Sequence, residues 1–173
     1  MNKKFRLDLI ITILICLISF PLIIFKPVQL TIVSGNSMSP TLYNGELLLL
    51  TKGSPIKNDI VTFNAKSAWN ENNLNRDFIK RVVGVPGDEI KIEKNKLYIN
   101  NNEIVDFEGK IKNKIGNHLY KLKEYEYFVT GDNTGNSHDS LLRLLSGETN
   151  YVVNKKLLNY KLSNIENKRN KWY

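Results

Sequence analysis

The chain has 173 residues, of which 42% are hydrophobic, and a formal net charge of +8. This length suits one folded domain with an appended membrane segment and leaves no room for a second large domain. A single cysteine, Cys16, and two histidines exclude an intramolecular disulfide and argue against a metal site, so we expect neither metal nor cofactor. The lysines are scattered and no nucleic-acid-binding motif is present, which argues against a nucleic-acid partner.

Residues 9–25 form the apolar run LIITILICLISFPLIIF. A helix of this run would be about 26 Å long, at the short end of what crosses a bilayer. Basic residues lie within residues 1–8 and only Lys26 closely follows the run, so the positive-inside rule places the amino terminus in the cytoplasm. A cleavable signal peptide is the alternative, but no Ala-x-Ala-like site follows the run. We predict a retained, single-pass membrane anchor.

Residues 26–163 consist of short β-prone runs separated by Gly, Pro, Asn and Asp. Alternating apolar residues in EIKIE and KLYIN, around Lys94 and Asn95, predict a β-hairpin. Residues 164–173 are polar and basic, and we expect a frayed tail there. The sequence therefore predicts a mostly β extracytoplasmic domain that follows one transmembrane helix.

Three segments combine Gly or Pro with reactive or clustered polar side chains: SGNSMSPTL at 34–42, FIKRVVGVPGD at 78–88 and GDNTGNSHDS at 131–140. In the first segment, Gly35 and Pro40 indicate an irregular backbone that exposes the hydroxyl of Ser37. In the third, His138 and Asp139 are adjacent. Adjacent side chains of an extended strand point apart, which argues against a Ser-His-Asp triad.

Lys80 and Arg81 are neighbours in an apolar strand, so alternation sends one of the two side chains to each face. If Lys80 points inward, burial disfavours its ammonium form and lowers its pKa. A fall from about 10.4 to about 8 costs roughly 3 kcal/mol and leaves an amine that can act as a base for a serine without any histidine. The structural alternative is that Lys80 reaches solvent or pairs with Asp77 or Asp88.

In order and content, these three segments resemble the nucleophile, lysine and last boxes of the bacterial type I signal peptidase (leader peptidase) family, and NDIVTF at 58–63 resembles the strand box between them. The resemblance covers about residues 30–140. It implies an antiparallel β-sheet catalytic domain of signal-peptidase type, with residues 93–125 as a smaller inserted β region. It also implies that Ser37 is the nucleophile and Lys80 the general base.

The resemblance implies supporting roles for further residues. The oxyanion would be held by the Ser37 backbone N–H and a second donor. Some relatives have a hydroxyl where Gly35 stands, so Ser34, the backbone and water are the candidates for that donor. Ser137 would hydrogen-bond and orient the ammonium group of Lys80.

Two further expectations concern the last box and the membrane. Asp139 would stabilise the last box through an ion pair. The family usually has an arginine two residues after that aspartate, where this chain has Leu141, and Arg143 is the candidate replacement. The apolar surface around Met38 and Leu42 is expected to face the substrate and to rest on the membrane.

The activity implied by the resemblance is that of signal peptidase I. Such an enzyme is a serine endopeptidase of the bacterial cell membrane that removes signal peptides with small residues at the first and third positions before the cut. Its partners would be exported preproteins, the lipid bilayer and the protein-export translocon. Two alternatives remain open, namely a dedicated processing peptidase of a conjugation or pilin system and an inactive membrane-tethered binding domain.

Overall fold

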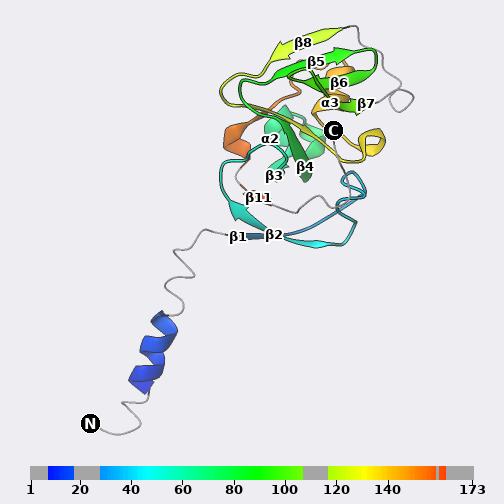
Figure 1. The fold of residues 1–173 in the computed structure, drawn as a ribbon. Helices are drawn as coiled ribbons and strands as arrows, with labels where there is room; N and C mark the ends of the chain where they lie inside the picture. The colour runs from blue at the N-terminus through cyan, green and yellow to red at the C-terminus, as the bar shows by residue number, and fades with distance from the viewer. Residues whose placement is uncertain (1–7, 18–27, 107–116, 159, 163–173) are drawn as a thin grey trace.

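The computed structural model describes residues 8–17, 28–106, 117–158 and 160–162. Its strands form two antiparallel sheets, a large one of seven strands and a small one of four (Figure 1). The prediction of a mostly antiparallel β fold is therefore confirmed.

The large sheet carries both the first and the last strand of the described chain. Its order is β1 (Val28–Ile32), β2 (Leu47–Lys52), β11 (Tyr160–Leu162), β3 (Ile60–Asn64), β4 (Asp77–Gly84), β9 (Glu126–Thr130) and β10 (Val153–Asn154). The strand latest in the sequence, β11, thus lies between β2 and β3 and pairs with both.

The small sheet has the order β7 (Asn102–Asp106), β6 (Lys96–Ile99), β5 (Glu89–Glu93) and β8 (His118–Lys121). Its strands β5 and β6 form the predicted hairpin. The turn residues Lys94 and Asn95 have φ angles of 49° and 60°, the left-handed values that two-residue hairpin turns favour. This sheet begins before residue 93, the predicted start of the inserted region.

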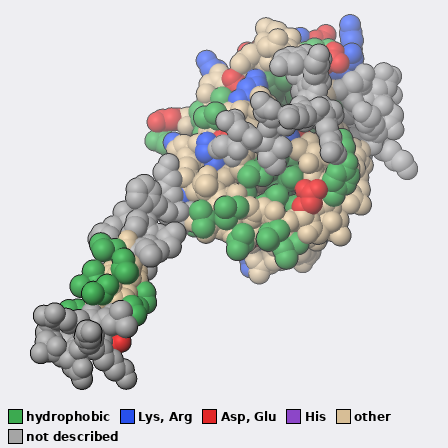
Figure 2. Space-filling model, turned by 60° about the horizontal axis from the view of Figure 1, so that its bottom comes forward, with side chains coloured by type: hydrophobic (Ala, Val, Ile, Leu, Met, Phe, Trp, Pro, Cys, Tyr) green, Lys and Arg blue, Asp and Glu red, His purple; other side chains and the backbone are tan. Residues whose placement is uncertain are grey.

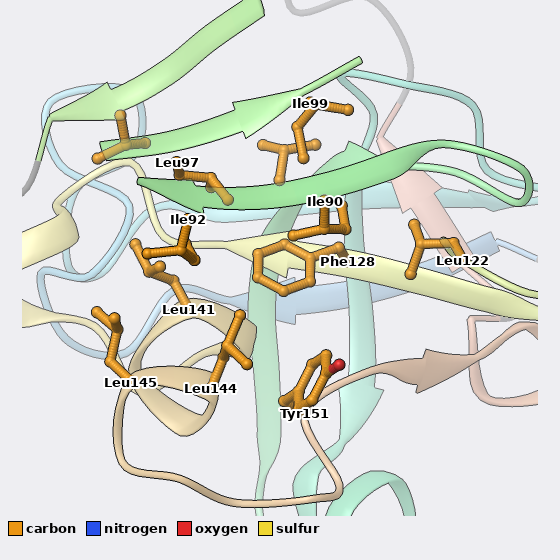
Figure 3. Packing of buried hydrophobic residues seen from close by; sticks show 12 residues of the cluster. Ile90, Ile92, Leu97, Ile99, Leu122, Phe128, Leu141, Leu144, Leu145 and Tyr151 are labelled. Atoms are coloured by element: carbon orange, nitrogen blue, oxygen red, sulfur yellow. The ribbon is translucent and has the colours of Figure 1, made fainter. Parts of the chain in front are cut away.

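Short helices connect the strands, and one of them supports the small sheet. They are α2 (Ala65–Trp69), η1 (Asn72–Leu74), η2 (Thr134–Asn136), α3 (Ser140–Leu145) and η3 (Lys155–Leu157). Alternation in EIKIE turns Ile90 and Ile92 toward α3, whose Leu141 and Leu144 point back at them (Figure 3). The resulting apolar cluster fixes the small sheet against α3, which begins at the final residue of the segment 131–140.

Residues 8–17, the blue helix of Figure 1, form the described part of the predicted anchor at 9–25. Among the residues that the structure describes, no helix has the length and apolar character needed to cross a membrane. The remainder of the anchor, most of residues 1–8 and the predicted tail at 164–173 lie outside the described residues.

Met38 and Leu42 do not form a membrane-facing surface, so that prediction is wrong. Their side chains are only 1% and 2% exposed. Alternation along β2 turns Leu48 and Leu50 inward, and these leucines bury Met38 and Leu42 in a common apolar cluster with neighbouring residues. A methionine covered in this way cannot contact a bilayer.

The opposite face of β1 and β2 is the one that exposes apolar side chains. Because these strands are antiparallel neighbours, Leu30 lies beside Leu49 and Ile32 beside Leu47. We call this surface the β1–β2 apolar face, and it consists of Val28, Leu30, Ile32, Leu47 and Leu49, each more than half exposed. Figure 2 shows hydrophobic side chains gathered on the side of the molecule that carries these strands.

Candidate active site

Ser37 and Lys80 meet although they come from different parts of the large sheet. Ser37 lies in the loop between β1 and β2, whereas Lys80 lies within β4, where it is paired with Val61 of β3. The Lys80 Nζ atom is 2.8 Å from Ser37 Oγ, a hydrogen-bond distance. The structure therefore brings together the two residues that the family resemblance pairs as nucleophile and general base.

Burial changes the acid–base behaviour of Lys80, which is only 3% exposed. Loss of hydration lowers its pKa from 10.5 to about 8, and the positive charge of Arg76 acts in the same direction. The carboxylates of Asp139 and Asp132 oppose this shift, with the larger effect from Asp139. Lys80 can therefore lose its proton in mildly alkaline water and accept one from a neighbouring hydroxyl.

The structural alternative for Lys80 is not realised. Asp77 accepts a hydrogen bond from Asn64, and Asp88 accepts from Asn100 and from the backbone N–H of Val85. Neither carboxylate pairs with Lys80, whose amine is buried rather than directed into solvent.

Arg81 is buried too, on the face of β4 opposite Lys80. Its guanidinium donates two hydrogen bonds to Asp132, of 2.8 and 2.7 Å, and a third to the carbonyl oxygen of Asn58. Both faces of β4 are thus covered, whereas the sequence indicated only that one of the two cations could point inward. The pair with Asp132 ties the segment at 131–140 to β4, the strand that carries Lys80.

The loop that carries Ser37 is held by close backbone contacts. The backbone N–H of Asn133 donates to the Ser37 carbonyl oxygen at 3.0 Å, and the Asn133 side chain donates to Asn36. Gly131 lies so near that a Cβ atom there would be 2.5 Å from the same Ser37 oxygen and 2.2 Å from Ser137 Oγ. Only glycine fits at this position without moving the loop that carries Ser37.

Gly35 adopts a φ of +89°, a left-handed value that glycine tolerates best. Its backbone N–H donates to the Asn44 side chain at 2.8 Å and is therefore already engaged. Ser34 and Gly35 both line the groove beside Ser37, and the Ser34 side chain is exposed there.

Ser137 is buried next to Ser37 and Lys80. The expected hydrogen bond from Ser137 to Lys80 is absent among the described residues. The Ser137 Oγ atom has no hydrogen-bond partner within the described part of the chain. The hydroxyl lies near enough to Asp139 to favour the ionised carboxylate, although the two groups do not have hydrogen-bond geometry. Ser137 instead packs against Gly131, where a Cβ would collide with it.

Asp139 is 1% exposed and is held by backbone groups rather than by an ion pair. It caps α3 by accepting from the Leu142 N–H at 3.0 Å, and it also accepts from the Gly131 N–H at 2.8 Å. Burial raises the pKa of this carboxyl, while the Gly131 N–H, the Leu142 N–H and the charge of Lys80 act against the rise. The predicted arginine partner is therefore wrong, because two N–H donors occupy that role.

Arg143 does not take the place of the arginine that the family usually has at the position of Leu141. Its guanidinium donates to Glu71 at 2.6 Å, to Glu148 and to the carbonyl oxygen of Asn150. Leu141 is fully buried in the apolar cluster of Figure 3, where a charge would have no partner. Arg143 thus ties α3 to the loop after α2 and not to Asp139.

A groove of about 920 Å³ passes over Ser37 and Lys80. Sequence reasoning missed most of its walls, although Phe78 could have been found because it lies two residues from Lys80 on the same face of β4. The apolar part of the groove is lined by Ile32, Val33, Met38, Phe78 and Ile79. The groove therefore offers an apolar surface directly beside a serine–lysine pair.

His138 also lines this groove, but it has no place in a triad. Its ring contacts Trp69 and Phe78, with centroid separations of 5.8 and 5.9 Å. The carboxylate of Asp139 turns away to the backbone groups of α3 and Gly131. The expectation that these neighbouring side chains diverge is therefore correct.

Comparison with known proteins gives a consistent family assignment. Residues 6–157 match the family model described as signal peptidase, peptidase S26. The chain is 30% identical over 159 residues to signal peptidase I U of Bacillus subtilis, covering 81% of this chain and 80% of that protein. It is 47% identical over 72 residues to signal peptidase I of Streptococcus pneumoniae, covering 41% of this chain and 32% of that protein.

A crystal structure of a signal peptidase I from Enterococcus faecalis is also similar, with a TM-score of 0.44 and 22% identity. It covers 65% of this chain and 100% of that one. The family model spans most of the sequence and includes both Ser37 and Lys80. The chain therefore belongs to the signal peptidase family, peptidase S26.

Proposed function

We propose that this protein is a type I signal peptidase, a serine endopeptidase that removes amino-terminal signal peptides from exported preproteins. The observation that carries this proposal is the 2.8 Å contact between the buried amine of Lys80 and the hydroxyl of Ser37. Membership of the signal peptidase family supports the same activity.

In the proposed reaction, Ser37 Oγ attacks the carbonyl carbon of the scissile peptide while Lys80 takes the hydroxyl proton. Lys80 then gives that proton to the leaving amine, and an acyl group remains on Ser37. Water, deprotonated by Lys80, hydrolyses the ester and frees the serine. With a pKa of about 8, roughly one Lys80 in ten is neutral at pH 7, enough for a base that works best in mildly alkaline conditions.

The oxyanion formed during attack needs two donors. We assign the first to the backbone N–H of Ser37 and the second to the hydroxyl of Ser34. Two observations support Ser34, namely its exposed position in the groove and the engagement of the Gly35 N–H by Asn44. Replacing Ser34 by alanine should therefore lower kcat by about 100- to 1000-fold.

Substrate selection follows from the apolar wall of the groove. Because Met38 is held in the core and Phe78 packs against Trp69 and Phe63, neither can move aside easily. A pocket with rigid apolar walls accepts small side chains and excludes large ones. We therefore propose substrates with alanine or similarly small residues at the first and third positions before the cut.

We further propose that the protein works at a bacterial cell membrane. Residues 9–25 would be a single-pass anchor with the amino terminus in the cytoplasm, and residues 26–163 the extracytoplasmic catalytic domain. The exposed β1–β2 apolar face would rest on the lipid, since soluble surfaces rarely gather so many large apolar side chains. This arrangement would bring Ser37, on the loop after β1, close to preproteins leaving the translocon.

The proposal is tested with full-length protein in detergent and a precursor that carries an Ala-x-Ala site. The parent should cleave after the second alanine, as read from the new amino terminus by mass spectrometry. Ser37→Ala and Lys80→Ala should abolish cleavage, whereas Lys156→Ala, at an exposed lysine, should retain it. A Ser37→Ala protein that still processes the precursor would refute the assignment.

A further inference from the structure

The two residues of the proposed catalytic pair lie on parts of the large sheet that do not pair directly. Ser37 belongs to the hairpin of β1 and β2, and Lys80 belongs to β4, which pairs with β3. Within the described residues, β2 forms no ladder with β3. The three residues of β11 fill the space between these strands and pair with each of them.

The register of β11 places it in line with the base. Lys161 is the partner of Thr51 on one side and of Val61 on the other, and Val61 is in turn the partner of Lys80. A single row of paired residues therefore runs from the nucleophile hairpin, through Lys161, to Lys80. Any displacement of β11 acts on the hairpin and on the base strand at the level of the catalytic amine.

Side chains fix β11 in this slot. Lys161 Nζ lies 2.7 Å from Asp59 Oδ2, and the two side chains are only 16% and 6% exposed. The same Asp59 oxygen accepts from the backbone N–H of Ile56, so the carboxylate is fixed before it meets the lysine. A largely buried ion pair with a fixed partner is sensitive to the loss of either member.

The neighbours of Lys161 connect β11 to the nucleophile itself. Tyr160 and Leu162 pack against the apolar cluster that contains Met38, the residue next to Ser37. The hydrogen bond from Asn133 to the Ser37 carbonyl holds the loop from its other side. The loop is thus held at one end by the last box and at the other by the hairpin that β11 attaches to the sheet.

We propose that β11, through Lys161, is a positioning element for catalysis, because it sets the separation of Ser37 and Lys80 by fixing the nucleophile hairpin to the base strand. This inference rests on the proposed peptidase function. A loss of alignment of about 1 Å between reacting groups can lower a rate by about 100-fold. A hairpin that moves away from β4 also lets water reach Lys80.

Water at Lys80 gives a readout that simple destabilisation does not. The charged groups that act on this amine are Asp139, Arg76 and Asp132, and none of them lies on β2 or β11. A weakened β11 should therefore change the pKa of Lys80 only through hydration, which moves it up toward 10.5. By contrast, partial unfolding leaves the midpoint of the pH profile unchanged once each rate is divided by the folded fraction at the same pH.

The experiment compares full-length Lys161→Pro, which removes strand pairing, with Lys161→Met, which keeps the backbone and removes the ion pair. Lys156→Met is the matched control, since Lys156 is exposed. The dependence of kcat on pH is measured with an Ala-x-Ala precursor, and each rate is divided by the folded fraction that thermal unfolding gives at the same pH. Hydrogen exchange of residues 28–52 is recorded on the same samples, so the coupling is tested even if no precursor is cleaved.

We expect Lys161→Pro to lower kcat by about 100-fold and Lys161→Met by about three- to tenfold, each with a pH midpoint above that of the parent. Exchange in residues 28–52 should become faster in both and stay unchanged in Lys156→Met. If Lys161→Pro does not fold, the pH midpoint and exchange rates of Lys161→Met alone test the inference. A folded Lys161→Met protein with the parent's pH midpoint and exchange rates overturns the inference, whereas an inactive parent with faster exchange in the variants refutes only the proposed function.

Discussion

Replacing Lys80 by methionine should stabilise the fold while it abolishes activity. At about pH 6 the amine is protonated in the folded and in the unfolded chain, so the folded state bears the whole cost of a buried charge. Lowering the pKa from 10.5 to about 8 corresponds to about 3 kcal/mol. The variant also loses the hydrogen bond to Ser37, worth about 1 kcal/mol, which leaves a net gain of about 2 kcal/mol in the free energy of unfolding.

This gain should disappear as the pH rises. Between about pH 8 and 10.5 the unfolded chain still binds a proton at Lys80 that the folded chain has released. The stability of the parent therefore increases with pH throughout this window, while that of Lys80→Met has no such component. Above pH 10.5 the amine is neutral in both states, and the variant should be less stable than the parent by the about 1 kcal/mol of its lost hydrogen bond.

The measurement is urea unfolding of full-length parent and Lys80→Met in detergent at several pH values, followed by tryptophan fluorescence, for which the buried Trp69 is a reporter. The exposed Lys156→Met serves as the control for removing a lysine. A variant less stable than the parent at about pH 6, or a difference that is constant with pH, would refute the reasoning about burial.

Three further substitutions test other contacts. Gly131→Ala should lower kcat/KM by about 100-fold or more, because a Cβ atom would lie 2.5 Å from the Ser37 carbonyl oxygen, and steady-state kinetics with a folded variant checks this. Asp139→Asn keeps an N-cap oxygen but removes the charge that raises the pKa of Lys80, so the midpoint of the pH–rate profile should move below that of the parent; a shift to higher pH would contradict this sign. Leu141→Arg, which restores the residue usual in the family, should destabilise the protein by about 3 kcal/mol or more in urea unfolding, since the side chain lies in a closed apolar core.

The longer strands could be predicted from sequence because their signals are local, whereas the pairing of Ser37 with Lys80 was expected only from the resemblance to the signal peptidase family. Runs such as DIVTF and FIKRVVGV are apolar and bounded by turn residues, and they correspond to β3 and β4. Strand β11 could not be predicted, since Tyr160–Leu162 is short and has a lysine at its centre. It becomes a strand only because β2 and β3 offer a slot, and that slot exists only in the folded sheet.

The partners of charged residues were the least predictable part of the site. Asp139 is bound by N–H groups of Gly131 and Leu142, and Arg143 by Glu71 on a distant loop. These contacts depend on how α3 packs against the small sheet, which is set by long-range burial. The same is true of Met38, whose place in the core follows from the register of β2 rather than from its own segment.

The position of β11 in the sequence has a consequence for how the protein is made. Lys161 and Asp59 are separated by 102 residues, so the large sheet closes only after nearly all of the described chain has been synthesised. Contacts of such high sequence separation form late and slowly in folding. Until Leu162 is available, the hairpin that carries Ser37 lacks its attachment to the strand that carries Lys80. The order of the strands thus delays the assembly of a protease until its own synthesis has passed the last strand.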